Sequence, residues 1–379
     1  MSIFANLWSF VGYAGPFLLV LGIVVFFHEL GHFLVGRWCG VKADVFSLGF
    51  GPELYGRVDR HGTRWRLALI PLGGYVKFHG DANAASAGVN AEGLSEEERR
   101  FSFFTQPVWK RVLIVAAGPV ANFILAVVIF AGVTFIVGRG ALAPRVESLR
   151  PGEVAEAAGF KPGDVIRSID GKAVASWGEV QRIVQVSAEK TLTFVIEREG
   201  GDVTLQATPK LRLIDTPLGK NRIGLIGLNG SNKAEDWKII RFGPLEALTQ
   251  GVVETWYVGE RTLSFLAGLV VGKESFDQVT GPIGTGYLAG KVATFGFSAL
   301  MNLAAVLSVS IGLINLLPIP LLDGGHLLFY LFEAVKGRPL SERTQEVGFR
   351  LGLAFVVVLM LFTTFNDLLN LLRRQVGAG

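Results

Sequence analysis

His28-Glu29-Leu30-Gly31-His32 stands at the end of Met1–Phe27, an apolar stretch that contains no charged residue. On a helix, residues four positions apart project from one face. Two imidazoles so placed can hold one zinc ion, and the glutamate beside the first can serve as general base to a bound water. Ionisable groups at membrane depth are costly and usually functional. The alternative interpretation places both histidines in loop water just beyond the membrane.

The composition is that of a membrane protein with a modest soluble part. Of the 379 residues, 50% are hydrophobic and only 18% are charged, unlike an ordinary soluble domain. The net charge is only +4. Because the basic residues stand beside apolar stretches, they indicate membrane topology rather than a nucleic-acid surface. A single cysteine, Cys39, excludes an intramolecular disulfide, and we expect it to be inert packing.

Four apolar stretches are long enough to span a membrane as helices. They are Tyr13–Trp38, Val112–Gly138, Val292–Leu322 and Leu351–Leu372. The first lacks the basic start and the small-residue cleavage site of a secretory signal peptide, so we expect it to be retained. A further segment, about Gly243–Lys273, combines an apolar stretch with several glutamates and is expected to form an amphipathic helix at the membrane surface.

The basic residues predict the topology of the spans. The connection between the first two spans and the connection between the last two are rich in lysine and arginine. The positive-inside rule places both connections in the cytoplasm. The segment from Gly140 to about Lys291 and both termini then lie outside, although Arg373 and Arg374 weigh mildly against this topology.

The outer segment has the pattern of a small strand-rich domain. Short alternating strands with Gly, Pro and Asp-Gly turns run from about Leu142 to Asp215, with an extension to Leu228. The pattern resembles a PDZ domain of the bacterial, circularly permuted type. That resemblance implies capture of an extended chain end by strand addition, with Gly224–Gly227 as the carboxylate loop. The alternative is a steric filter that binds no peptide.

A zinc site needs at least a third protein ligand. Asp323 follows a long uncharged stretch and precedes two glycines, which allow a tight approach of the backbone. A carboxylate in such a place needs a partner, and a metal is the natural one. His326 is the rival ligand, although a role behind the ligands or at a helix start suits it better. Asn315 and Asp323 flank a proline-broken turn, so both can face one cavity.

Together these motifs resemble the site-2 protease family. The resemblance rests on His-Glu-x-x-His in a first span and Asn-x-x-Pro-x-x-x-Leu-Asp-Gly in a late span. It covers nearly the whole chain and is closest to the regulator-of-sigma-E protease group. Four further motifs agree with it: Gly49–Pro52, Pro71–Lys77, Ala117–Asn122 and Gly281–Gly284. Some members carry two PDZ domains in tandem, where this chain has one.

The resemblance implies a role for each matching residue. His28, His32 and Asp323 would bind zinc. Glu29 would activate the water, and Asn315 would contact the substrate backbone near the cut. The reaction implied is hydrolysis of a peptide bond inside the transmembrane segment of a single-span protein, such as a pre-cleaved anti-sigma factor or a remnant signal peptide. The implied location is a bacterial plasma (inner) membrane, with the active site towards the cytoplasm.

A hairpin is expected between the first two spans. Arg64–Tyr75 becomes apolar after its start, and His61-Gly62 supplies a turn. A strand edge at membrane depth must find hydrogen-bond partners or line a cavity. Because a substrate helix must unwind before cleavage, an edge strand could pair with the unwound segment. Gly73, Gly74 and Tyr75 are the candidate contacts. The alternative is an interfacial hairpin that touches no substrate.

The predicted architecture is an α-helical polytopic membrane protein with a membrane-associated β-hairpin and one extracytoplasmic PDZ-like α+β domain. We expect residues 1–139 and 292–379 to form the two halves of the membrane core, 140–228 the PDZ-like domain and 229–291 the amphipathic-helix region. A metal transporter or sensor and a catalytically inactive scaffold are the competing functions. Glu29 argues against both, because neither needs a general base beside the first histidine.

Overall fold

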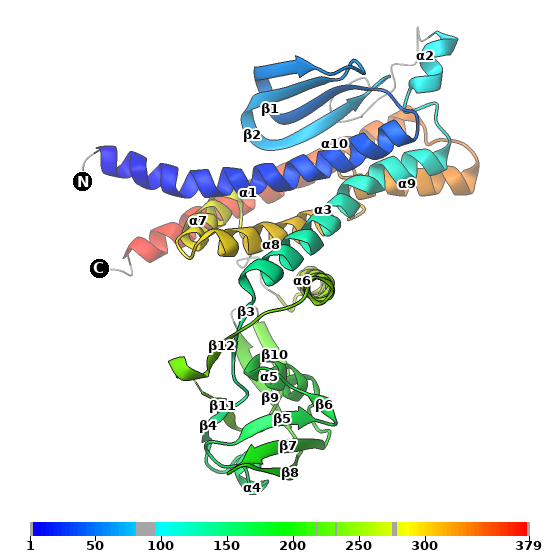
Figure 1. The fold of residues 1–379 in the computed structure, drawn as a ribbon. Helices are drawn as coiled ribbons and strands as arrows, with labels where there is room; N and C mark the ends of the chain where they lie inside the picture. Colours follow the sequence, from blue (N-terminus) through cyan, green and yellow to red (C-terminus); the bar gives the residue numbers. More distant parts are fainter. Residues whose placement is uncertain (1–2, 81–94, 217–218, 232, 275–278, 377–379) are drawn as a thin grey trace. The chain divides into compact units, whose positions relative to one another are not determined.

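The computed structural model describes residues 3–80, 95–216, 219–231, 233–274 and 279–376 (Figure 1). The chain divides into two compact units. We call the first the membrane unit; it comprises Met1–Val133, Pro244–Ala267 and Val279–Gly379. The second, the strand-rich unit, comprises Thr134–Gly243 and Gly268–Gln278. All the predicted site residues belong to the membrane unit.

Four helices of the described chain are long and apolar enough to cross a membrane. They lie within α1 (Ile3–Trp38), α3 (Val108–Val137), α8 (Phe297–Asn315) and α10 (Glu342–Val376). The prediction of four span-capable helices is therefore confirmed. α1 packs against α8 and also against α7 (Pro282–Ala293), so the first and third spans are neighbours.

The third apolar stretch is shorter as a helix than the sequence predicts. In place of one helix over Val292–Leu322, the structure has α7, a break at Gly296 and then α8. Gly296 has a φ of 103°, which glycine adopts without a steric penalty. Beyond Asn315 two prolines prevent the helix from continuing, because proline lacks the backbone N–H that a helix interior requires. The chain becomes helical again in α9 (Asp323–Lys336).

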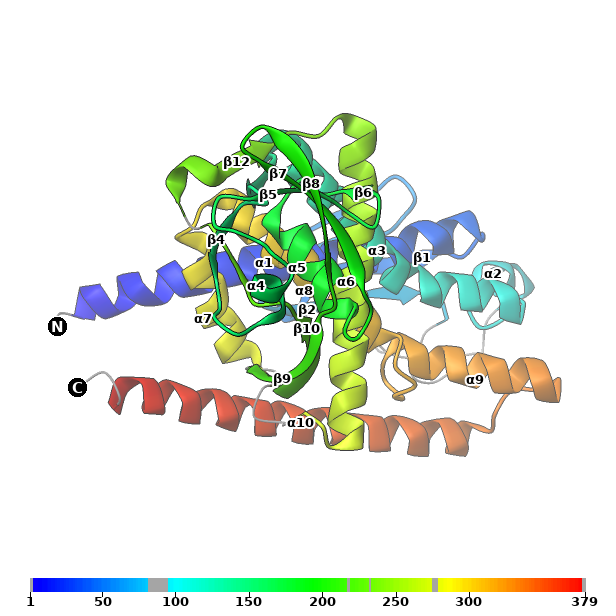
Figure 2. The ribbon, with the colours of Figure 1, turned by 90° about the horizontal axis from the view of Figure 1, so that it is seen from below.

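α6 (Pro244–Val271) runs across the direction of α1 and α10 (Figure 2). Its buried side is a stripe of small residues that includes Ala247 and Gly251. A Cβ at Gly251 would stand 2.6 Å from the Val127 carbonyl oxygen of α3, so the two helices are in close contact. Large apolar side chains such as Trp256 cover the opposite side and are exposed. The bounds of this helix agree with the segment expected over about 243–273, and its place at the membrane surface stays a prediction.

The predicted hairpin is a more folded sheet than two simple strands. β1 (Ala43–Val58) and β2 (Arg64–Phe78) are each bent back on themselves, so that segment 43–48 pairs with both 64–67 and 74–78. Segment 53–58 pairs with 64–68 on the far side. The bends fall at Gly49 and Gly73, which have φ values of 88° and 130°. Segment 74–77 is consequently an edge of the sheet, paired on one side only within the described residues.

Aromatic side chains fix this sheet to the last turns of α1. The Phe46 and Trp65 rings stack at 4.3 Å, and Phe33 of α1 meets them edge-on at 5.5 and 5.1 Å. Phe33 and Phe46 are almost fully buried. Burying one such side chain contributes about 1.5–3 kcal/mol, so the cluster holds the sheet beside the His-Glu-x-x-His segment. A short helix, α2 (Glu96–Phe101), precedes α3.

The strand-rich unit contains an antiparallel sheet of order β6-β5-β7-β8, which packs on a helix. Ile166, Phe194 and Trp177 are among its buried core. Its helices are α4 (Val154–Ala157), α5 (Trp177–Val186) and a 3₁₀ turn (Ala234–Asp236). Its strands are β3 (Arg139–Leu142), β4 (Val146–Leu149), β5 (Val165–Ile169), β6 (Lys172–Ala173), β7 (Leu192–Arg198), β8 (Gly201–Ala207), β9 (Lys210–Thr216), β10 (Gly219–Leu225), β11 (Leu228–Gly230) and β12 (Trp237–Ile240).

The segment expected to form a carboxylate loop lies directly against α5. A Cβ at Gly224 would overlap the Val184 carbonyl oxygen, and a Cβ at Gly230 would overlap the Trp177 ring. Both glycines therefore bring backbone into contact with the helix. The α5 side of segment 224–230 is thus already covered by side chains and backbone of the same unit.

Candidate active site

Small residues bring α1 and α3 together at the two histidines. A Cβ at Gly31 would overlap the Ala117 carbonyl oxygen and stand 2.8 Å from the Ala121 Cβ, so this glycine lets the helices touch. One helical turn away from Ala121, Gly118 lies beneath both imidazoles. A Cβ there would overlap the His32 ring and stand 2.9 Å from His28 Cε1. The space that the rings occupy thus depends on glycine at position 118.

Hydrogen bonds from α3 orient both imidazoles. His32 Nδ1 lies 2.9 Å from the Ile114 carbonyl oxygen, so it carries the proton and donates it. His28 Nδ1 lies 3.2 Å from the Asn122 side-chain amide. Asn122 is fully buried, and its Oδ1 has no partner within the described residues when Nδ2 faces the ring. Exchanging the two amide atoms lets Oδ1 accept from His28 Nδ1–H, which leaves both Nε2 lone pairs free for a ligand.

Asp323 completes a three-residue cluster with the two histidines. His28 Nε2 lies 3.2 Å from His32 Nε2 and 3.3 Å from Asp323 Oδ2, and His32 Nε2 lies 3.6 Å from Asp323 Oδ1. Ligand atoms about 2.0–2.1 Å from a tetrahedral zinc ion stand about 3.3 Å apart, so this cluster fits zinc. Asp323 Oδ2 is buried without a hydrogen bond among the described residues, as expected for an oxygen whose partner is a metal.

Two glycines bring Asp323 to this position. Asp323 is the first residue of α9, and a Cβ at Gly324 would overlap the Leu316 and Leu317 carbonyl oxygens. A Cβ at Gly325 would likewise overlap the Ile319 carbonyl oxygen. The first turn of α9 therefore packs directly on the non-helical segment after α8. Close packing at this turn aims the carboxylate at α1.

Glu29 lies against the edge of the sheet. Its carboxylate lies near the Val76 backbone N–H. A Cβ at Gly74 would stand 3.0 Å from Glu29 Cγ, so only a glycine leaves the carboxylate this much room. Glu29 is buried, with 9% of its surface exposed. The predicted general base thus sits between the histidines and segment 74–78.

All the predicted site residues line one cavity of about 700 Å³. Its wall is made by α1, β1, β2, α3, α8, α9 and α10 and by loop residues between them. The cavity brings together side chains that are far apart in the sequence and adds one that the prediction left aside, His326. The predicted residues that line it are His28, Glu29, His32, Gly73, Gly74, Tyr75, Asn315 and Asp323.

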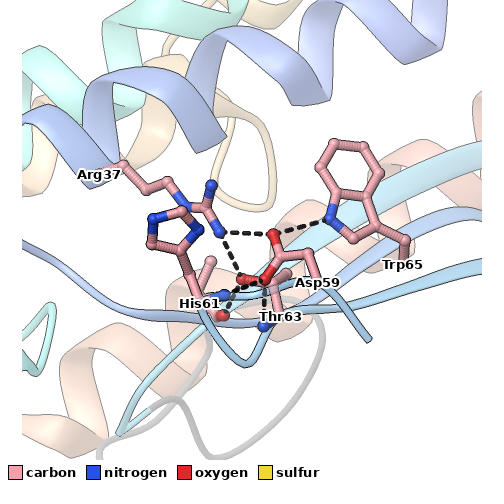
Figure 3. Close-up of polar contacts among 6 residues, drawn as sticks. Arg37, Asp59, His61, Thr63 and Trp65 are labelled. Atoms are coloured by element: carbon pink, nitrogen blue, oxygen red, sulfur yellow. Dashed lines mark hydrogen bonds and ion pairs between the residues drawn. The ribbon is translucent and has the colours of Figure 1, made fainter. Parts of the chain in front are cut away.

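A polar cluster fastens the sheet to α1 (Figure 3). The Asp59 carboxylate accepts from Arg37 Nη2 at 2.6 Å and Trp65 Nε1 at 3.1 Å. It also accepts from the backbone N–H groups of His61 and Thr63 at 2.8 and 3.0 Å. Burial alone would raise the pKa of Asp59, but these donors hold it well below its usual range. We call Arg37 and Asp59 the sheet clamp.

A second ion pair joins α3 to α9. The Arg111 guanidinium bonds both carboxylate oxygens of Glu333 at 3.1 and 2.6 Å, and Arg111 lies over the Tyr330 ring at 4.9 Å. Sequence reasoning missed this pair, the sheet clamp and the function of Asn122. In the sequence, each appears only as a charged or polar residue inside or beside an apolar stretch. Such a residue indicates that a partner exists but not which residue the partner is.

Comparisons with known proteins identify the family. A model of peptidase family M50 matches residues 16–359. This chain belongs to peptidase family M50. A relative from Brucella suis, named "Putative zinc metalloprotease", is 48% identical over 94% of this chain and 95% of its own length. Metalloprotease MmpA from Caulobacter vibrioides is 40% identical over 93% of this chain and 94% of its own length. The predicted resemblance to the site-2 proteases is confirmed.

Membership of family M50 makes this protein a zinc metalloprotease, and its four span-capable helices make it a multi-pass membrane protein. Among solved structures, the PDZ domain of an SdrC-like protein from Listeria monocytogenes covers 24% of this chain and 86% of its own length, at 23% identity. The TM-score of 0.18 is too low to carry an argument. The PDZ-like character of the strand-rich unit stays a prediction.

Proposed function

We propose that this M50 peptidase hydrolyses a peptide bond within the transmembrane segment of a single-span protein. The observation that carries the proposal is one cavity lined by His28, Glu29, His32 and Asp323, among helices that are long and apolar enough to cross a membrane. A shortened anti-sigma factor or a remnant signal peptide is the kind of substrate that fits. The bilayer is then the medium of the reaction.

His28, His32 and Asp323 would hold the zinc ion, and Glu29 would move the proton. When bound, zinc polarises the peptide carbonyl and makes a water molecule acidic enough to attack near neutral pH. Glu29 takes a proton from that water and delivers it to the nitrogen of the leaving amine. A C–O bond forms and the C–N bond breaks, so one water is consumed and two chain ends are released.

The edge of the sheet would hold the substrate backbone. Within the described residues, segment 74–77 pairs with one strand segment only, and Gly73, Gly74 and Tyr75 line the cavity beside Glu29. A substrate helix must unwind before its carbonyl can be attacked, and strand addition would pair the released N–H and C=O groups. Asn315, at the end of α8, would contact the same backbone. The alternative is a sheet that merely covers the site.

The sidedness of the protein belongs to the same proposal. The site would face the cytoplasm of a bacterial inner membrane, with the strand-rich unit outside. Residues 140–228 would form the PDZ-like domain, 229–291 the amphipathic-helix region, and 1–139 with 292–379 the membrane core. Because segment 224–230 lies directly on α5, a steric filter accounts for the unit better than capture of a peptide end.

The decisive experiment is cleavage of a tagged single-span reporter in membranes by the wild type, Glu29→Gln and Asp323→Ala, with zinc measured in each purified protein. We expect both variants to leave the reporter intact and only Asp323→Ala to lose zinc. If Glu29→Gln cleaves as well as the wild type, proteolysis by this mechanism is wrong. Metal transport then becomes the better explanation, and zinc uptake into vesicles would test it.

A further inference from the structure

His326 is a polar side chain in the cavity that the proposed mechanism does not use. It lies three residues after Asp323 on α9, so the two side chains share one helix face about 5–6 Å apart at Cβ. The metal-ligand cluster of the described residues contains His28, His32 and Asp323 but not His326. Its nitrogens are therefore beside the zinc site without belonging to it.

The His326 ring is held in place by its carbon faces and not by its nitrogens. The Phe349 ring of α10 lies 5.3 Å away and the Tyr330 ring 6.4 Å away, both tilted. Among the described residues no hydrogen bond or ion pair reaches either His326 nitrogen. His326 lines the cavity and is only partly buried, so its N–H can bond a group that enters the cavity. Here the partner is expected to come from outside the chain.

Other polar groups around the cavity either have a role in the proposed mechanism or contact neighbouring side chains. Glu29 handles the proton, and Tyr75 stacks on Phe50 with Arg66 over its ring. Attack on a peptide carbonyl builds negative charge on the carbonyl oxygen, and a donor fixed in advance beside that oxygen accelerates the reaction. His326 stands next to Asp323, where that oxygen must come to be polarised.

We propose that His326 is a catalytic residue whose imidazole N–H donates a hydrogen bond to the carbonyl oxygen of the scissile peptide as it becomes negative. This rests on the proposed protease function of the same site. The donor strengthens its bond only as charge develops, so its loss affects turnover more than substrate binding. No proton is transferred by His326, and the balance of the hydrolysis is unchanged.

The test compares His326→Phe, which keeps a ring against Phe349, with His326→Gln, which keeps a donor. The probe is a detergent-solubilised reporter with one apolar helix that carries a central Gly-Pro break. We expect kcat to fall about 10²-fold in His326→Phe, with KM and zinc content unchanged, and to recover at least partly in His326→Gln. Gln181→Phe, at an exposed position of α5 in the strand-rich unit, is the control and should match the wild type.

A second readout does not depend on turnover. A phosphinic peptide, whose tetrahedral anion resembles the charged carbonyl oxygen, should bind His326→Phe about 10²-fold more weakly than the wild type. Equal binding and equal kcat would overturn the proposal. A loss of zinc in His326→Phe would also overturn it and make His326 a metal-site residue. If Glu29→Gln cleaves like the wild type, the protease mechanism fails instead, and the phosphinic peptide still tests His326.

Discussion

The cavity has a helix wall, formed by α1 and α3 around His28 and His32, and a sheet wall, formed by segment 73–77 of β2. The two walls are organised differently. On the helix wall, every nitrogen of His28 and His32 has a neighbour, and Gly118 leaves space for their rings alone. On the sheet wall, segment 74–77 pairs with a single strand segment within the described residues, and the chain bends at glycines with positive φ. A metal requires fixed ligands, whereas varied substrate backbones require an adaptable edge. Substitutions in the helix wall should therefore reduce zinc binding, whereas substitutions in the sheet wall should reduce substrate cleavage without loss of zinc.

Gly118→Ala should damage the helix wall most. The added methyl group would occupy the space of the His32 ring and press on His28. We expect loss of zinc and a fall in cleavage of more than about 10²-fold, because small misplacements of reacting groups are that costly. Gly132→Ala on the same helix is the control, since a Cβ there meets nothing within 4 Å. Full zinc content in Gly118→Ala would contradict the close packing described for this wall.

Asn122→Ala should weaken zinc binding by about 10–100-fold, the usual effect of removing a group that orients a metal ligand. The reason is that His28 Nδ1 would lose its partner and the ring its orientation. Asn302→Ala, a matched change in another span, should leave zinc affinity unchanged. Competition with a zinc chelator measures both. Equal affinities would show that Asn122 is a packing residue.

Arg37→Met should damage the sheet wall alone. It keeps an apolar stem against Phe33 but removes the charged partner of Asp59. We expect kcat/KM to fall about tenfold, roughly the value of one charge-assisted hydrogen bond, with zinc content unchanged. Arg57→Met, on an exposed part of β1, is the control. Zinc loss in Arg37→Met would mean that the two walls are not independent.

The sheet clamp should resist mild acid, which is the smallest effect we predict. Because the pKa of Asp59 is depressed in the folded protein, its stabilisation is complete above the unfolded pKa of about 3.9 and is lost as the pH falls through the lower folded value. The difference in Tm between the wild type and Asp59→Asn should thus be constant from pH 5 to 8 and shrink below about pH 4. A difference that already shrinks near pH 6 would refute this assignment.

The candidate ligands could be predicted because each carries its own local signal. His28 and His32 share a helix face by spacing alone, and Asp323 is conspicuous after a long uncharged stretch. The four span-capable helices follow from length and apolarity for the same reason. The third is broken within its predicted bounds, since glycine and proline interrupt an apolar stretch without changing its hydropathy. The fourth begins at Glu342, before the predicted Leu351, because charged residues in its first turns hide the helix from an apolarity criterion.

The rest depends on contacts between distant segments. Gly118 looks like any glycine in an apolar helix until α1 is placed against it. The double pairing of segment 43–48 arises because both strands bend back, and alternation of side chains does not encode which segments then meet. Arg37 and Asp59 are ordinary charges at the ends of their elements, and only their meeting makes them a clamp.

The late position of Asp323 in the chain has a consequence for how the site forms during synthesis. His28 and His32 emerge from the ribosome early, but their third partner follows only after the whole strand-rich unit and α8 have been made. A half-made chain in the membrane therefore offers two imidazoles and a glutamate without the carboxylate that completes the cluster. The metal-ligand cluster can therefore form only when most of the chain has been made.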